Sequence, residues 1–214
     1  KRQKKSKRLT LYRIKKIRTK KTMSSDDYLK QEIIQAMVTL KKGGLILYPT
    51  DTIWGIGCDA TNPDAIDRVY ALKKRSDAKA LICMVSDFRM LNEYVSDIPE
   101  VAYDILKYAI KPTTIIYDKP IRVAQNLLAE DESLGVRVTR HDFSKNLIHK
   151  FKRPLVSTSA NISGQPSPKS FQEIDPAILE GVDYVVNLER NKKNGPPSAI
   201  IKLKNDGTVQ IIRD

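Results

Sequence analysis

Residues 49–62 read PTDTIWGIGCDATN, and this stretch decides how the rest of the chain is interpreted. It follows LILY at residues 45–48, an apolar run that predicts a buried strand, and it combines threonines, an aspartate, an aromatic residue and two glycines. Polar loops that leave rigid elements carry much of the binding chemistry of proteins, although such a loop can also be a plain turn. We therefore expect a working loop over residues 49–60.

Two helices are predicted on either side of this loop. SSDD at residues 24–27 is typical of a helix N-cap region with acidic residues in the first turn, and Gly43-Gly44 ends that helix. Asn62 and Pro63 are typical of the cap and first turn of a second helix, which reaches Lys73. The apolar faces are expected to hold Ile33, Ile34, Met37 and Val38 in the first helix, and Ile66, Val69, Tyr70 and Ala71 in the second.

Strands and helices alternate through most of the remaining chain. The patterns predict strands at 80–86, 113–117, 134–139, 154–158 and 184–188, helices over 87–95, 98–110, 143–151 and 168–180, and a hairpin over 198–213 with a DG turn. This order favours an α/β fold. We expect a single domain with a twisted mixed sheet, parallel and antiparallel, and flanking helices.

The charge of the chain is concentrated at its start. The formal net charge is +13, but residues 1–22 hold 12 Lys or Arg and no acid, and the other 192 residues hold 26 basic and 25 acidic side chains. Such a run binds phosphate without sequence preference, so a contact of this tail with RNA is open. The alternatives are a disordered extension, an addition to the natural chain before Met23, or a targeting peptide. Residues 23–214 are expected to form the catalytic domain.

Several classes of protein and site are not favoured. The chain holds no run of 18 apolar residues and no secretory signal, so a cytoplasmic protein without a membrane span is expected. Cys58, Cys83, His141 and His149 lack the spacing of a metal site or a disulfide framework. GIGCDA at 55–60 fits a dinucleotide fingerprint, but its glycines do not open a helix, and no P-loop is present.

Three polar clusters remain as candidates for chemistry. Lys73 and Arg75 stand at the end of the second helix, where they either compensate the helix dipole or bind a ligand. STSANISGQP at 157–166 is either a ligand loop or a helix cap. Arg137 interrupts an apolar strand, so it is expected to face an anion, either a structural carboxylate or a ligand phosphate. Together these residue types favour an anionic ligand.

The loop at 49–62, the K-x-R pattern at Lys73 and Arg75, and the S-x-N pattern at Ser159 and Asn161 resemble the YrdC/Sua5 family, the threonylcarbamoyl-AMP synthases. The similarity spans residues 30–213. It implies an open α/β fold and a nucleotidyltransferase that joins L-threonine, bicarbonate and ATP, with Mg²⁺ accompanying ATP. Its product serves a partner enzyme that modifies adenosine 37 of tRNAs reading ANN codons, and direct tRNA contact is open.

The resemblance also implies roles for individual residues. Lys73 and Arg75 would be catalytic and would bind the triphosphate. Thr50, Thr52 and Trp54 would bind threonine. The residues implied to contact ATP are further Arg137, Ser159, Asn161, Ser198 and Arg213.

The chain departs from the family pattern in ways that concern its amino-acid substrate. Trp54 stands where the family usually has Tyr, and Met84 where many members have His. The glycine of the usual P-G-P segment and the proline after the Arg137 strand are also replaced. The open alternatives are a non-catalytic protein that binds tRNA or double-stranded RNA, a domain that handles carbamoyl-adenylate, and a paralogue with an altered substrate or little activity.

Overall fold

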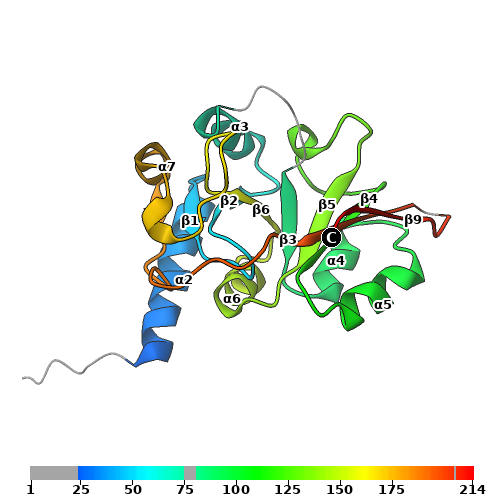
Figure 1. The fold of residues 1–214 in the computed structure, drawn as a ribbon, viewed down its shortest axis with the longest axis horizontal. Coiled ribbons are helices and arrows are strands. Elements are labelled where there is room, and N and C mark those ends of the chain that lie inside the picture. The colour runs from blue at the N-terminus through cyan, green and yellow to red at the C-terminus, as the bar shows by residue number, and fades with distance from the viewer. Residues whose placement is uncertain (1–23, 75–80, 205) are drawn as a thin grey trace, which may run out of the picture.

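The computed structural model describes residues 24–74, 81–204 and 206–214, so the predictions for the tail and for Arg75 lie outside the described residues. Its strands form one mixed sheet in the order β7-β1-β2-β6-β3-β5-β4-β8-β9 (Figure 1). Three neighbouring pairs are parallel and the others antiparallel, which confirms the α/β fold with a mixed sheet. The strands are β1 (Ile46–Tyr48), β2 (Gly55–Asp59), β3 (Ile82–Val85), β4 (Thr113–Tyr117), β5 (Leu134–Val138), β6 (Leu155–Ser159), β7 (Tyr184–Val185), β8 (Ala199–Leu203) and β9 (Val209–Arg213).

Helices flank the sheet. In the view of Figure 1, α2, α6, α4 and α5 lie below the strands and α3 lies above them. The helices are α2 (Ser25–Lys41), α3 (Pro63–Leu72), α4 (Phe88–Tyr94), α5 (Glu100–Tyr108), α6 (Asp142–Phe151) and α7 (Pro176–Gly181), with short 3₁₀ turns η1 (Gln125–Leu127) and η2 (Phe171–Glu173). The predicted helices at 87–95, 98–110 and 143–151 correspond to α4, α5 and α6.

The two helix starts predicted from capping residues are confirmed. The side chain of Ser24 accepts a hydrogen bond from the backbone N of Asp27, and Asn62 accepts one from the N of Ala65. Pro63 occupies the first turn of α3, where its missing N–H costs nothing. The helix that ends at Lys73 therefore has a defined beginning and places that lysine at its C-cap.

The predicted apolar face of α2 is wrong in part. Ile34 and Val38 are 48% and 40% exposed, whereas Ile33, Ala36 and Leu40 are buried. The reason lies in Glu32, which is also buried, because its carboxylate accepts hydrogen bonds from Tyr184 Oη at 2.7 Å and Asn187 N at 2.8 Å. A buried, hydrogen-bonded carboxylate thus occupies part of the helix face that was expected to be apolar. In α3, Ile66 and Val69 are buried as predicted, but Ala71 is exposed.

The predicted loop over residues 49–60 is shorter than expected, because residues 55–59 form the buried strand β2. It pairs antiparallel with both β1 and β6. Gly57 is needed there, since a Cβ at this position would lie 2.6 Å from Cε1 of Tyr48 and 3.0 Å from the carbonyl oxygen of Val156. The glycines therefore allow close strand packing, and only residues 49–54 form the polar loop.

The predicted helix over 168–180 is also wrong. The chain instead forms η2 and then α7, which begins at Pro176. Proline has no N–H to continue a helix from the preceding turn, so a new helix begins there, with Asp175 capping the N of Ala177. The predicted strand at 184–188 is reduced to the two residues of β7. The hairpin of β8 and β9 is confirmed, with Gly207 at φ +84° in its turn.

A long connection crosses the sheet. Strand β7 lies at one end of the strand order and β8 beside the other end, so residues 186–198 run across the molecule, as the orange segment in Figure 1 shows. The N of Gly195 donates to the carbonyl oxygen of Thr52 at 2.9 Å, which fixes this crossing segment on the 49–54 loop. In the described ranges, the helices are too short or too polar to span a bilayer.

Candidate functional site

One face of the sheet gathers small, hydroxylic and basic side chains. Side chains alternate between faces along a strand, and the strand register therefore decides which residues share a face. Gly55 pairs with Ser159, Gly57 and Ile82 pair with Ser157, and Met84 pairs with Arg137. The register further places Thr114 and Ile200 opposite one another, and Ile200 opposite Arg213. Residues from seven strands thus meet on one surface.

A cavity of about 290 Å³ lies over this face. Among the described residues, no acidic side chain lines it and two arginines do. Its volume is near the lower end of the ~300–1,000 Å³ range of small-molecule sites. The lining residues are Thr50, Thr52, Ile53, Gly55, Ile82, Arg137, Ser157, Thr158, Ser159, Ser167, Pro197, Ser198, Ile200 and Arg213. The site is thus suited to an anion that offers oxygen atoms to hydroxyl and guanidinium donors.

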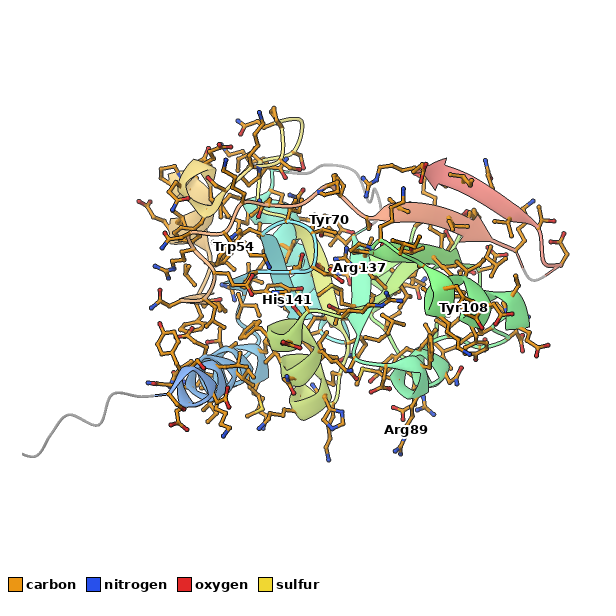
Figure 2. All side chains as sticks on the ribbon, turned by 60° about the horizontal axis from the view of Figure 1, so that its bottom comes forward. Trp54, Tyr70, Arg89, Tyr108, Arg137 and His141 are labelled. Carbon is orange, nitrogen blue, oxygen red and sulfur yellow. The ribbon has the colours of Figure 1, made fainter. Side chains whose placement is uncertain are left out.

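Two guanidinium groups face this cavity. Arg137 is 3% exposed and lies near the middle of the sheet (Figure 2). Arg213 comes from the last strand, and its Nε donates to the carbonyl oxygen of Ser198 at 2.9 Å. Burial, and then the positive charge of Arg137, lower the pKa of Arg213. Like charges that share a cavity are stabilised when an anion lies between them.

The hydroxyl groups of the loop are held by short local hydrogen bonds. Thr50 Oγ1 donates to the carbonyl oxygen of Ile53 at 2.7 Å and accepts from the N of Thr52 at 3.1 Å. Both threonines are buried and line the cavity. On the opposite side, Ser198 Oγ lies 3.0 Å from Thr114 Oγ1. The predicted residues Thr50, Thr52 and Ser198 are therefore brought to one site with Arg137 and Arg213.

Lys73 of the K-x-R pattern also meets the S-x-N loop in space. Lys73 Nζ donates to the carbonyl oxygens of Ser159 at 2.6 Å and Asn161 at 2.7 Å. Ser159 lines the cavity, whereas Lys73 is 2% exposed and lies behind the loop that it holds. Asn161 Nδ2 donates within its own loop, and its Oδ1 is buried without a hydrogen-bond partner. The geometry gives Lys73 a role in fixing the S-x-N loop, and its proposed contact with phosphate stays a prediction.

Trp54 is placed in the core. It is 1% exposed, its ring centroid lies 4.9 Å from that of Phe171, and it is not among the residues that line the cavity. Arg190 in turn lies over the Phe171 ring at 4.7 Å. Trp54 thus supports the crossing segment and the adjacent loop, and its proposed contact with threonine stays a prediction.

A second cavity of about 320 Å³ lies beyond the ends of β3 and β5. Lys107, Lys111, Arg140 and Lys145 line it together with apolar residues such as Phe88 and Ile110, and with Asp51 and Asp87. Asp51 lines this second cavity and also adjoins the first, because its carboxylate lies 3.5 Å from Nη2 of Arg137. None of the residues predicted for the site lines this second cavity.

Three residues of the site were not predicted individually from the sequence, although Ser157 begins the candidate segment at 157–166. Ser157 stands two residues before Ser159, so strand alternation puts both on one face. Asp51 lies between the two threonines of the loop, and its position there was the only local signal. Thr114 becomes part of the site through its hydrogen bond to Ser198, 84 residues away, which no local pattern reveals.

Side chains that bind metals do not cluster in the described part of the chain. No group of three His, Cys, Asp or Glu with metal-site geometry occurs in residues 24–74, 81–204 and 206–214. Both cysteines are buried thiols, and burial raises the pKa of Cys58 and of Cys83. The described part of the chain therefore provides no metal centre of its own.

Comparisons with known proteins give a consistent result. Residues 38–214 match the family model Sua5_yciO_yrdC, which carries the description "Telomere recombination". A threonylcarbamoyl-AMP synthase from Xanthomonas euvesicatoria is 33% identical over 187 residues, which cover 86% of this chain and 97% of the relative.

Solved structures agree. E. coli YciO superposes with a TM-score of 0.75 at 25% identity, covering 86% of this chain and 89% of YciO. P. abyssi Sua5 in complex with L-threonine superposes with a TM-score of 0.70 at 26% identity. That match covers 82% of this chain, which corresponds to about half, 51%, of the longer Sua5 chain.

Proposed function

Since this chain belongs to the Sua5/YciO/YrdC family, we propose that it is a threonylcarbamoyl-AMP synthase, a nucleotidyltransferase that forms threonylcarbamoyl-AMP and pyrophosphate from L-threonine, bicarbonate and ATP. The observation that carries the proposal is the cavity over the sheet, where Arg137 and Arg213 face hydroxyl groups from β6 and from three connecting segments. A relative with this name matches nearly over its full length, and P. abyssi Sua5 was solved with L-threonine.

The arrangement suits the chemistry. The amine of threonine and bicarbonate give a carbamate with loss of water, and the carbamate oxygen then attacks the α-phosphate while pyrophosphate leaves. This reaction brings a carboxylate, a carbamate and a triphosphate together, so the main barrier is repulsion between anions. Pre-positioned cations and donors lower such a barrier by orientation and charge stabilisation.

We assign the residues as follows. Arg137 and Arg213 bind the phosphates, and Thr50 and Thr52 orient the amino acid. Ser159 and Ser198 donate to the nucleotide from opposite sides of the cavity. Lys73 holds the S-x-N loop in place through Ser159 and Asn161, while Arg75 contributes a second charge on the K-x-R side.

Mg²⁺ is proposed to arrive with ATP. Because the described residues include no cluster of metal ligands, the residues present do not fit a protein-held ion, and the phosphates would be its ligands. We further propose the cytoplasm as the compartment, since the product serves tRNA. The partner would be an enzyme that transfers the threonylcarbamoyl group to adenosine 37.

The test is pyrophosphate release by the full chain from ATP and bicarbonate, with and without L-threonine. We expect release that depends on threonine, and a rise of about tenfold in the KM for ATP in Arg213→Gln, since one charged donor is worth ~1.4 kcal/mol or more. Arg89→Gln is the matched control, because the Arg89 side chain is 91% exposed and lies away from the cavity. Threonine-independent or absent release from a folded chain that binds ATP would refute the proposed reaction.

A further inference from the structure

The guanidinium of Arg137 is held from two sides. Its Nη1 donates to Thr52 Oγ1 at 3.2 Å, and its Nη2 donates to the thioether sulfur of Met84 at 3.1 Å. Met84 is the register neighbour of Arg137 on the adjacent parallel strand, so β3 itself fixes this contact. Both partners are neutral, and neither offsets the charge that burial has removed from water.

Asp51 supplies the negative charge that offsets it. Its Oδ1 lies 3.5 Å from Arg137 Nη2, and the side chains of Arg137 and Asp51 are only 3% and 11% exposed. A buried guanidinium without an opposite charge is strongly disfavoured, so this pair holds Arg137 in place. The pair is an ion pair, and Asp51 Oδ1 accepts no hydrogen bond from the described residues, so Asp51 acts on Arg137 through charge and leaves its donors available.

The position of Asp51 is itself determined by neighbouring groups. Thr139 Oγ1 and the N of Arg140 lie at 3.5 Å from Asp51 Oδ2, just after the end of β5. The loop that carries Asp51 is tied by Thr50 to Ile53. The carboxylate thus joins the 49–54 loop to the strand that bears Arg137.

One donor and one acceptor of this pair are left without a partner. The Nε of Arg137 and the Oδ1 of Asp51 are both buried without a hydrogen-bond partner in the described part of the chain. Buried polar atoms are rarely left unpaired, and those that are commonly have a functional reason. The Nε belongs to a side chain that lines the cavity, which also receives Arg213.

We propose that Asp51 is a positioning residue: it holds Arg137 in the orientation that binds the anionic substrate, and it offsets the repulsion between Arg137 and Arg213 before that substrate arrives. This role rests on the proposed function for the identity of the anion, ATP. Asp51 does not touch the substrate, so its effect is transmitted entirely through Arg137.

The direction in which the ATP affinity changes on substitution of Asp51 distinguishes a positioning role from a purely electrostatic one. Removing a negative charge near an anion site should tighten ATP binding if charge alone mattered. Loss of a positioning group should weaken it. We therefore expect Asp51→Asn to raise the Kd for ATP by about tenfold, within the range of coupling between residues in contact.

The experiment is a double-mutant cycle on the full chain, read by calorimetric titration with ATP in the absence of threonine. The variants are Asp51→Asn, Arg137→Gln and the double variant, with Asp104→Asn as matched control because Asp104 carries the same charge on the exposed side of α5. We expect Asp51→Asn to change the Kd less than twofold in the Arg137→Gln background, since the group that it positions is gone.

Pyrophosphate release supplies the second measurement. We expect the KM for ATP to rise in Asp51→Asn with kcat changed much less. Additive effects in the cycle, or equal or tighter ATP binding by Asp51→Asn, would overturn the proposal. If Asp51→Asn does not fold, Asp51→Glu replaces it, because it keeps the charge but moves the carboxylate, and the same loss and the same coupling are expected.

The two proposals fail in different ways. A wild-type chain that binds ATP but shows no threonine-dependent release contradicts the synthase reaction, while the binding cycle still decides the role of Asp51. A chain that shows the reaction but an additive cycle contradicts only the positioning role.

Discussion

Lys73 Nζ donates to the carbonyl oxygen of Ser159 at 2.6 Å, a contact between residues 86 positions apart in the chain. It connects the C-terminal end of α3 with the end of β6. A second bond to the carbonyl oxygen of Asn161 makes the ammonium group a clamp on the loop after β6. The lysine that sequence comparison suggests for phosphate binding thus also shapes the site.

Lys73→Met is expected to lower the free energy of unfolding by about 2–3 kcal/mol, because two buried carbonyls lose a charged donor. For a chain of this size that corresponds to a fall of roughly 4–10 °C in Tm, measured by thermal unfolding. Lys30→Met, on the exposed side of α2, should leave the Tm within about a degree. Equal melting of Lys73→Met and wild type would show that the clamp contributes no stability.

Gly57→Ala should destabilise the chain by about 1–3 kcal/mol through overpacking. The added Cβ would lie 2.6 Å from the Tyr48 ring and 3.0 Å from the Val156 backbone, and the backbone cannot turn aside. Gly195→Ala is the matched control, because its Cβ would meet the Thr52 carbonyl oxygen at an ordinary 3.6 Å. Denaturant unfolding measures both, and comparable losses would refute the packing argument.

The ion pair of Asp131 and Lys202 predicts a pH dependence. The Lys202 ammonium and the Ser133 hydroxyl lower the pKa of Asp131 to about 2. Because the folded pKa is depressed below the ordinary value of ~3.9, the contribution is fully present above that value and is lost as pH falls through about 2. Asp131 is more than half exposed, so we expect only about 0.5 kcal/mol at pH 7.

NMR titration measures the Asp131 carboxyl directly. In Lys202→Gln its pKa should rise toward the ordinary value, while Lys204→Gln, a nearby exposed lysine, should leave it nearly unchanged. An unaltered Asp131 pKa in Lys202→Gln would assign the shift to Ser133 instead.

The basic tail makes a prediction for RNA. If residues 1–22 bind phosphates, deletion of this segment should abolish most binding to single-stranded or duplex RNA, and binding by the full chain should weaken steeply with salt. Fluorescence anisotropy at several salt concentrations measures both effects. RNA binding that survives the deletion with an unchanged salt slope would place the contact on the body of the protein.

Local signals in the sequence predict those parts of the fold that local interactions determine. Ser24 and Asn62 cap their helices as expected, and Asp206-Gly207 forms the expected turn. Gly55–Asp59 was expected to be loop, because glycines weaken strand propensity and the reason for them, the Tyr48 ring, lies on another strand. Pairing with β1 and β6 makes this segment a strand, although its intrinsic strand propensity is low.

In the site, too, some residues could be predicted from the local sequence and others could not. Arg137 could be predicted to need an anion, since a charge inside an apolar strand requires one. The loop geometry after β1 brings Asp51 to Arg137 as its counter-charge. The pairing of the last two strands brings Arg213 to the same cavity. Contacts that span 80 residues or more leave no local pattern.

The crossing of residues 186–198 from β7 to β8 has a consequence for synthesis of the protein. Ser198 and Arg213 reach the cavity only through this crossing, so a nascent chain made only as far as Val185 lacks one of the two arginines and the Ser198 hydroxyl. We therefore expect the cavity to bind an anionic ligand more weakly until the β8-β9 hairpin has docked on the sheet.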